Sequence, residues 1–278
     1  MLYARALMLR NCGRFTHVSS DFGSQYHTHV FVTSEALYAS LTREVTWRHE
    51  TRFIDLDADA GKSGRHDYFL CDYNVRAKPL WFTAGLFVDE NLRVVPKRAM
   101  SRRGQPGGQR PVVDTTNFNV IDEDYPSTGG KRADGGQRRF FCPTYGRIES
   151  VLPDHRLFTF ALAAELEHLE WFKSGQTFLM GKKRTMFQLI GASSVTELVE
   201  SAESAALEEY QPVQIKLDEV KNFREYEVIA GTARYLLVRG VATSASLAAS
   251  ISDFAGIGPT RRFLPTFWVE RARQMISG

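Results

Sequence analysis

The feature that most constrains the fold of this chain is a long stretch, Pro96 to Gly136, in which apolar residues recur with almost no regular period. It contains the runs GQPGGQ, STGG and ADGG, whose glycines favour turns and unusual backbone shapes. Only Arg110–Val120 within it has the apolar spacing of a strand. A long insertion between two ordered flanks is typically functional or disordered. The sequence therefore predicts ordered structure on both sides of an inserted segment.

The charges are unevenly divided along the chain. Residues 93–147 hold 11 basic and 5 acidic residues, whereas the residues before and after this segment carry a small acidic excess. The formal net charge of +3 therefore originates entirely in the middle of the chain. A local cationic excess of this kind favours a polyanionic partner.

The residue patterns of the two flanks predict several strands and a few helices. Leu2–Leu9 is apolar enough for a strand, the polar run Arg10–Gly23 ends in turn residues, and Thr33–Leu41 has helical spacing with Ser34 as its expected cap. Further strands are predicted at Thr46–Asp57, Tyr68–Tyr73, Leu80–Leu86, Arg147–Leu152, Leu157–Ala163, Gln176–Met180, Thr185–Ile190, Val213–Leu217, Glu225–Ala230 and Ala233–Arg239. Val195–Glu209 is predicted as a helix, and Ser244–Gly278 as a small-residue helix followed by a proline-interrupted segment. This order predicts an α+β fold of the ferredoxin-like type.

Several classes of protein are not expected. The longest apolar runs are too short for a membrane-spanning helix, and Arg5 interrupts the opening apolar stretch, which does not fit a signal peptide. Three scattered cysteines without a CxxC pair argue against a thiolate metal site and favour a reducing, cytoplasmic setting. The sequence lacks the GxxxxGK[ST], GxSxG and HExxH motifs. No metal, cofactor or catalytic residue is therefore predicted.

Gly181-Lys182-Lys183-Arg184 is the strongest local signal, because it separates two predicted strands. A glycine at such a turn permits close backbone approach, and three neighbouring cations can neutralise phosphates. The alternative interpretation of this tetrapeptide is a solvated hairpin tip.

The inserted segment carries a second basic signal in which arginines stand beside aromatic residues. Arginine binds phosphates in a bidentate manner, and aromatic rings stack on unpaired bases, so this combination is typical of single-stranded RNA binding. The alternatives are arginines that serve solubility and a Phe140–Phe141 pair that belongs to the core. The cations predicted to contact RNA or DNA are Arg98, Arg102, Arg103, Lys131, Arg132, Arg138 and Arg139.

Two motifs and their spacing resemble a known family. Pro143-Thr144-Tyr145-Gly146-Arg147-Ile148 is similar to a proline, glycine-arginine-isoleucine strand entry, and Phe178-Leu179-Met180-Gly181-Lys182-Lys183-Arg184 is similar to a glycine-lysine turn after an apolar strand. A weaker likeness runs from Phe22 to Leu41, where Tyr26 precedes a short helix. These features resemble the family-five Cas proteins of the RAMP superfamily, which cap the crRNA 5′ handle in type I-D CRISPR surveillance complexes.

The resemblance implies a ferredoxin-like (RNA-recognition-motif-like) domain over residues 1–240, with residues 93–139 as an inserted basic arm. Residues 241–278 would form a C-terminal extension of unknown role. It also implies that Gly181, Lys182, Lys183, Arg184, Arg147 and Tyr26 contact the crRNA handle. The implied partners are crRNA, target DNA, a repeated backbone Cas subunit and a large Cas subunit.

Two other functions remain open from the sequence. Some relatives in another subtype cleave repeat RNA, so a metal-independent endoribonuclease with His17 or His27 as general base and Lys182 as a charge stabiliser is an alternative. The other is a scaffold subunit whose basic arm binds an acidic protein surface.

Overall fold

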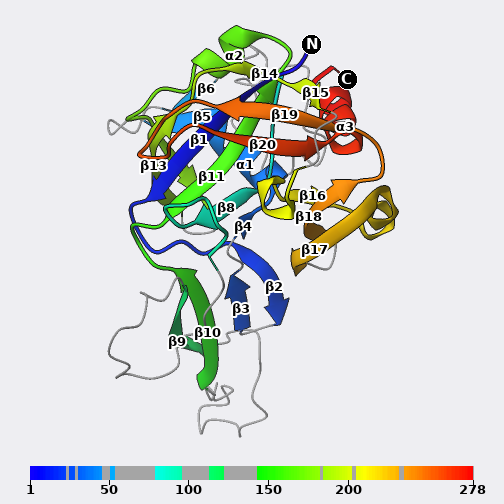
Figure 1. Cartoon of the computed structure of the whole chain (residues 1–278). Coiled ribbons are helices and arrows are strands. Elements are labelled where there is room, and N and C mark those ends of the chain that lie inside the picture. Colours follow the sequence, from blue (N-terminus) through cyan, green and yellow to red (C-terminus); the bar gives the residue numbers. More distant parts are fainter. Residues whose placement is uncertain are drawn as a thin grey trace, which may run out of the picture.

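The computed structural model describes residues 1–22, 25–28, 31–45, 51–53, 79–95, 113–121, 143–181, 184–201, 205–231 and 235–277. These residues form a mixed α and β structure that is dominated by strands (Figure 1). The predictions for Tyr68–Tyr73 and for most of Thr46–Asp57 lie outside the described residues. Within that second segment, Thr51–Phe53 forms strand β6, which pairs with β5 (Arg43–Val45). No helix in the described ranges has the length and apolar character to cross a membrane.

The central sheet is arranged around β1 (Tyr3–Asn11), the strand predicted at the amino end. β1 lies between two antiparallel neighbours, β11 and β13. Residues of both its faces are buried, from Ala6 through Leu9, because the sheet is covered on both sides. In spatial order the sheet contains β12 (Thr177–Met180), β13 (Thr185–Ala192), β1, β11 (Arg156–Ala163), β8 (Gly85–Val88) and β4 (Phe31–Val32), with β14 (Thr196–Glu197) on β1 and β7 (Leu80–Phe82) on β11.

Helix α1 (Ser34–Leu41) confirms the prediction for this segment in all but its cap. Its buried residues Leu37, Tyr38 and Leu41 pack towards the central sheet, where Leu37 lies against Gly85. The capping residue is Thr33, whose hydroxyl accepts a hydrogen bond from the Ala36 N–H. The prediction of Ser34 as cap was therefore wrong by one residue, because Thr33 is the one with the extended backbone that a cap needs.

The carboxyl half forms two small sheets. One contains the three predicted strands Val213–Leu217, Glu225–Ala230 and Ala233–Arg239, and the other includes two segments that were predicted as helices. β15 (Val199–Ser201), β19 (Ser246–Ile251) and β20 (Thr260–Pro265) form one sheet, and β16 (Val213–Ile215), β18 (Leu236–Ala242) and β17 (Phe223–Gly231) form the other. Short 3-10 helices, η3 (Leu207–Glu209) and η4 (Leu217–Asn222), precede β16 and β17.

The two helix predictions in this half failed for the same reason. The segment predicted as Val195–Glu209 pairs with β1 and β19, and the Leu198 N–H donates to the Leu2 carbonyl, so neighbouring strands satisfy its backbone. Ser246–Ile251 pairs with β15 on one side and with β20 on the other, and all of its residues except Ser250 are buried. Tertiary pairing overrides helix propensity in both segments.

The carboxyl-terminal residues belong to the main core. The expected boundary at residue 240 falls inside β18, and α3 (Thr266–Ser277) contributes Trp268, Val269, Ala272 and Ile276 to the same hydrophobic cluster as β1. The indole N–H of Trp268 donates to the Gln214 carbonyl of β16 at 3.1 Å. The Gln214 side chain in turn accepts from the Ser34 N–H at the start of α1. Residues 241–278 therefore contact β16, which in turn contacts the start of α1.

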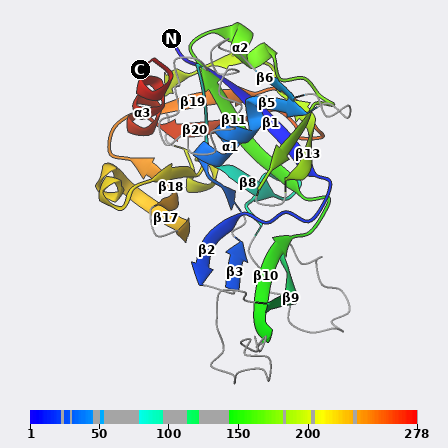
Figure 2. The same cartoon turned by 180° about the vertical axis from the view of Figure 1, so that it is seen from behind.

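A separate four-stranded sheet, called here the arm sheet, extends away from the central sheet (Figures 1 and 2). Its order is β2 (Val18–Phe22), β3 (Gln25–Thr28), β10 (Pro143–Val151) and β9 (Val113–Ile121). β9 and β10 pair in antiparallel register from Val113–Val151 to Ile121–Pro143. The strand predicted inside the aperiodic segment is confirmed as β9, and it is part of this sheet.

Candidate nucleic-acid interface

The Gly181 turn joins β12 to β13, as the sequence predicted. Met180 and Thr185 are register partners, and the Arg184 N–H donates to the Gly181 carbonyl at 3.1 Å to close the turn. Gly181 has φ +78°, and Arg184, which is exposed, has φ +49°. Lys182 and Lys183 lie outside the described residues. The backbone on both sides of these lysines is therefore fixed by the β12–β13 pair.

Gly181 packs closely on the segment that follows β1. A Cβ atom at this position would lie 2.7 Å from Cε2 of Phe15 and 2.7 Å from the Thr16 carbonyl oxygen. On the other side of the turn, the Thr185 hydroxyl donates to the Arg14 carbonyl at 2.7 Å. Only a glycine permits this approach together with a positive φ. The turn is thus held against residues 14–16.

The same Phe15–Thr16 segment also holds the carboxyl end of β10. Phe15 and Val151 exchange two backbone hydrogen bonds of 2.9 and 2.7 Å. The hydroxyls of Thr16 and Ser150 lie 2.9 Å apart, and both residues are buried. We call this meeting of the Gly181 turn, Phe15–Thr16 and Ser150–Val151 the junction. It brings together three segments that are remote in sequence.

Phe15 is the central side chain of the junction. It is fully buried, with its ring 5.0 Å from that of Phe187 on β13 and 5.9 Å from that of Phe87 on β8. The His17 ring is parallel to it at 6.1 Å. The sequence contained only a weak signal for this role, because Phe15 is one of two phenylalanines in the mostly polar Arg10–Gly23 run.

Arg147 and Tyr26 both belong to the arm sheet. Arg147 is the register partner of Gln25, and Tyr26 is the partner of Ile148, because β3 and β10 run parallel. Their strands are therefore adjacent, although 121 positions separate the two residues in the chain. Arg147 lies four residues from Val151, about 13 Å along an extended strand. The structure thus connects β10, which carries Arg147, to the Gly181 turn through Phe15–Thr16.

A buried carboxylate connects β3 to β10 just before the junction. Glu149 accepts a hydrogen bond from the Thr28 N–H at 3.2 Å and lies 3.3 Å from Nδ1 of His27. The Thr28 hydroxyl donates to the Glu149 carbonyl at 2.8 Å. Glu149 is buried and His27 is partly exposed. Sequence reasoning did not identify this residue, since a single glutamate in a strand has no distinguishing pattern.

Replacing Glu149 with alanine is expected to destabilise the protein by about 1–3 kcal/mol, because the buried Thr28 N–H loses its acceptor. Chemical denaturation measures the change, and amide hydrogen exchange at Thr28 locates it. Exposed Glu167, changed to alanine, is the control and should have little effect. Unchanged stability and unchanged Thr28 exchange in the Glu149 variant would contradict the role assigned to this carboxylate.

The two histidines of the endoribonuclease alternative lie near the junction but in different surroundings. His17 is half-buried beside the Phe15 ring, whereas His27 pairs with Glu149. A general base requires a nearby group that orients it and a substrate within reach. His27 has the first of these, and its contact with Glu149 also holds β3 against β10.

No described protein family and no curated protein matches this sequence significantly.

The arm cations predicted to contact RNA or DNA lie outside the described residues, and they are Arg98, Arg102, Arg103, Lys131, Arg132, Arg138 and Arg139. The strands next to these segments are described. Residues 122–142 connect β9 to β10, and residues 96–112 connect the end of the β8 region to β9. All seven cations are therefore in segments that begin or end at β9 or β10 of the arm sheet.

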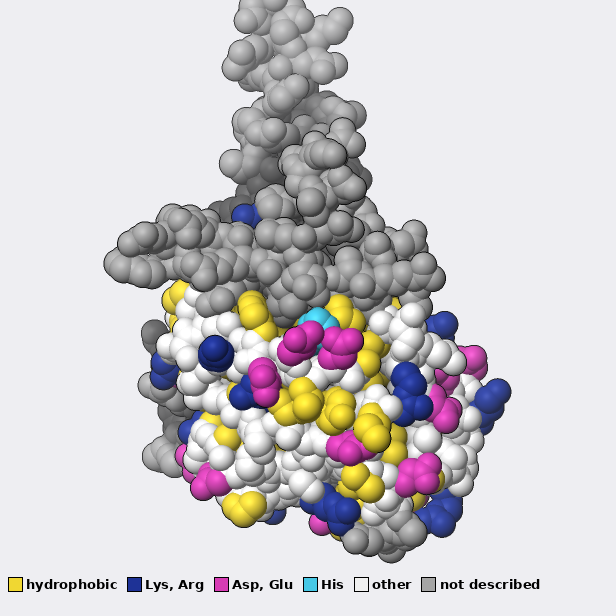
Figure 3. All heavy atoms as spheres, turned by 90° about the horizontal axis from the view of Figure 1, so that it is seen from above, with side chains coloured by type: hydrophobic (Ala, Val, Ile, Leu, Met, Phe, Trp, Pro, Cys, Tyr) yellow, Lys and Arg dark blue, Asp and Glu magenta, His cyan; other side chains and the backbone are white. Residues whose placement is uncertain are grey.

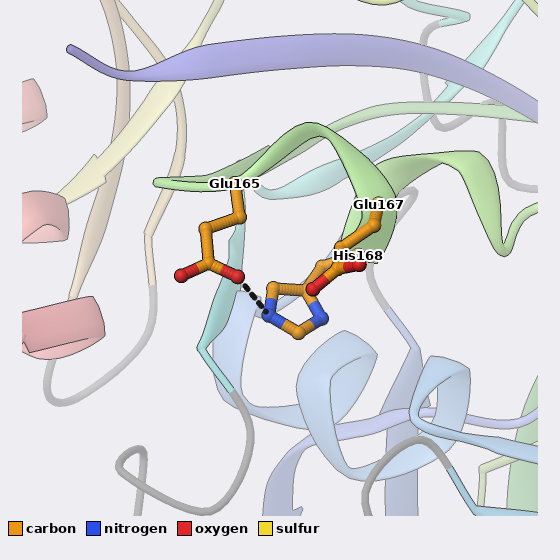
Figure 4. A group of neighbouring side chains, drawn as sticks. All are labelled: Glu165, Glu167 and His168. Atoms are coloured by element: carbon orange, nitrogen blue, oxygen red, sulfur yellow. Dashed lines mark ion pairs between the residues drawn. The ribbon is translucent and has the colours of Figure 1, made fainter.

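On the face in Figure 3, acidic, basic and apolar side chains are interspersed. One group there has potential metal ligands: Glu165, Glu167 and His168 at α2 (Leu166–Glu170) have ligand atoms within 4.8 Å of one another (Figure 4). Glu165 already pairs with His168 at 3.3 Å, and both glutamates are exposed. Three ligands are one fewer than a closed structural zinc site uses, and a surface ion pair accounts for the arrangement.

Proposed function

We propose that this protein is a non-catalytic RNA-binding subunit of a type I-D CRISPR surveillance complex, which binds the crRNA 5′ handle and helps to position target DNA. Lys182, Lys183 and Arg184 would bind handle phosphates at the Gly181 turn. The arm would extend along crRNA or target DNA. The proposed partners are the repeated backbone subunit and the large subunit of the complex, in a cytoplasmic setting.

The order of the central strands supports a ferredoxin-like core for this proposal. The chain order β1, α1, β8, β11, α2, β13 is strand, helix, strand, strand, helix, strand, which is the order of that fold. The spatial order β13-β1-β11-β8, antiparallel throughout, agrees with it. β4, β7, β12 and β14 would be additions to this core.

The observation that carries the functional proposal is the junction. Phe15–Thr16 contacts both the Gly181 turn and β10, so the turn of the central sheet and the base of the arm sheet form one continuous structure. In the sequence, the chain's main basic segments directly precede or follow strands of these two elements. A single polyanion can therefore contact the Gly181 turn and the base of the arm sheet. Basic clusters on opposite faces of the molecule would not permit this.

Changing Lys182 and Lys183 together to alanine tests the proposal. If each lysine neutralises one phosphate, affinity for repeat-derived RNA should fall on the order of tenfold, and the slope of log Kd against log salt should decrease by about two. Fluorescence anisotropy at several salt concentrations measures both. The matched control is the double change of exposed Lys216 and Lys221 to alanine, which removes the same charge elsewhere. Equal affinity and slope in the two double variants would defeat the assignment.

Two measurements separate the alternatives. Specific cleavage of repeat RNA in chelator, lost on changing His17 or His27, would favour the endoribonuclease. Purification from the native host without RNA, at an absorbance ratio typical of protein alone, would favour the scaffold. Repeat-derived 5′ ends in copurified RNA would support the proposed function.

A further inference from the structure

Two arginines meet where the small carboxyl-terminal sheets touch. Arg239 lies on β18 and Arg262 on β20, and these strands belong to different sheets that pack against each other. η3 contacts both strands. The Gln211 N–H donates to the Phe263 carbonyl at 2.9 Å, and the rings of Tyr210 and Phe263 lie 5.5 Å apart. The backbone around the two arginines is thus fixed by a hydrogen bond and by buried aromatic packing.

The two guanidinium groups are held in place without being fully hydrogen bonded. NH1 of Arg262 donates to the Glu208 carbonyl of η3, and NH1 of Arg239 lies 3.9 Å from the Glu227 carboxylate, which is largely exposed. The Nε atoms of both arginines are buried and have no hydrogen-bond partner among the described residues. Among the described residues, each group therefore retains at least one donor that is not hydrogen bonded.

The two charges also act against each other. The pKa of Arg262 is lowered by burial, and the positive charge of Arg239 lowers it further, whereas Glu209 opposes the shift. Arg261 of the same strand lies over the Phe263 ring, 5.5 Å from its centroid, and adds a third cation nearby. Among the described residues, the acidic groups that interact with this cluster are Glu209 and Glu227. A partly buried like-charge pair is unfavourable unless an anion compensates it.

We propose that Arg239 and Arg262 together bind a phosphate group of single-stranded RNA, as a contact separate from the junction. Guanidinium groups present planar, paired donors that match phosphate oxygens, and two of them where β18 packs against β20 can bind one phosphate from two directions. That the phosphate belongs to RNA rests on the proposed function. The binding of a phosphate group by this pair rests only on the geometry of β18, β20 and η3.

The phosphate part is tested without RNA. In a ¹⁵N–¹H spectrum of the full chain, the Nε–H signals of Arg239 and Arg262 should shift on addition of inorganic phosphate, and sodium chloride at equal ionic strength should not reproduce the shift. Assignment uses the single variants Arg239→Gln and Arg262→Gln. Unmoved signals at both positions would overturn the proposal, whatever the protein does with RNA.

The RNA part is tested with the double variant Arg239→Gln, Arg262→Gln and a fluorescent oligouridine. Binding should weaken about tenfold, as expected for the loss of one charge-assisted contact. The control is the change of exposed Arg273 and Arg224 to glutamine, which removes two charges from other surfaces. Thermal denaturation confirms that the variants remain folded, and Arg239→Lys with Arg262→Lys keeps the charge if the glutamine variant does not fold.

The outcomes distinguish this site from the junction. Loss of RNA affinity in the arginine variant, in addition to the loss in the Lys182, Lys183 variant, supports both contacts. Phosphate shifts with unchanged RNA affinity would mean that the pair takes small anions only and would overturn its assignment to RNA. Wild-type protein that binds no RNA would refute the proposed function, while phosphate shifts at Arg239 and Arg262 would still support the anion site.

Discussion

Replacing Gly181 with alanine is expected to destabilise the protein by about 2–5 kcal/mol, the sum of a backbone term and a packing term. The backbone term arises because an alanine at φ +78° is strained. The packing term arises because the new methyl would lie 2.7 Å from both the Phe15 ring and the Thr16 carbonyl oxygen. The ring cannot easily move, since it is buried between Phe87 and Phe187.

Gly256 supplies a matched control for this variant. It has φ +76°, almost the same as Gly181, but a Cβ there would meet nothing within 4 Å among the described residues. Gly256→Ala should therefore show the backbone term alone, about 1 kcal/mol. The difference between the two variants in chemical denaturation isolates the contact with Phe15–Thr16. Equal losses of stability in the two variants would mean that the Gly181 turn is not in close contact with Phe15–Thr16 and that the junction is loosely packed.

Gly181→Ala should also affect the arm sheet, because Thr16 and Phe15 hold Ser150 and Val151. The amide of Val151 donates to the Phe15 carbonyl and should exchange faster in the Gly181 variant than in the Gly256 variant. An unchanged Val151 amide would contradict mechanical coupling between the turn and the arm.

The parts of this fold that sequence could predict are those with a strong local pattern. β1, α1 and the β12–β13 pair have clear apolar periodicity and turn residues, and all three lie where the sequence placed them. Val195–Glu209 and Ser246–Ile251 contain many alanines and serines, which have no preference strong enough to resist pairing with neighbouring strands. Their structure depends on β1, β19 and β20, which local sequence does not reveal.

The candidate interface likewise contains residues that the sequence could identify and residues that it could not. Gly181 was found because a glycine before three cations is a local motif. Three other residues have roles that depend on contacts with residues more than 70 positions away or on another sheet, and no short sequence pattern marks such contacts. These residues are Phe15, Glu149 and Arg239. Charge counts located a basic segment between residues 93 and 147. They could not indicate that the Gly181 turn and β10 both pack on Phe15–Thr16, which only the fold provides.

Replacing Trp268 with alanine is expected to cost about 3–5 kcal/mol, the range for truncating a buried large aromatic side chain. Trp268 is 1 % exposed, and α3 packs against β7, β11, β19 and β20. The change also removes the indole donor to the Gln214 carbonyl, although the Arg271 side chain donates to the same oxygen at 2.7 Å and would keep it satisfied. Most of the expected loss is therefore apolar burial and the cavity left behind.

The extent of unfolding in this variant tests whether residues 241–278 are part of the core or an appendage. If α3 is part of the core, Trp268→Ala should lower the midpoint of a single cooperative transition, seen alike by far-ultraviolet circular dichroism and by fluorescence of the remaining tryptophans. Met275→Ala is the control on the same helix, because Met275 is 36 % exposed and should have little effect. A separate early transition confined to the carboxyl-terminal residues, with the midpoint of the rest unchanged, would mean that α3 docks on a core that is complete without it. The shared cluster of Trp268 with the β1 side chains predicts the single transition.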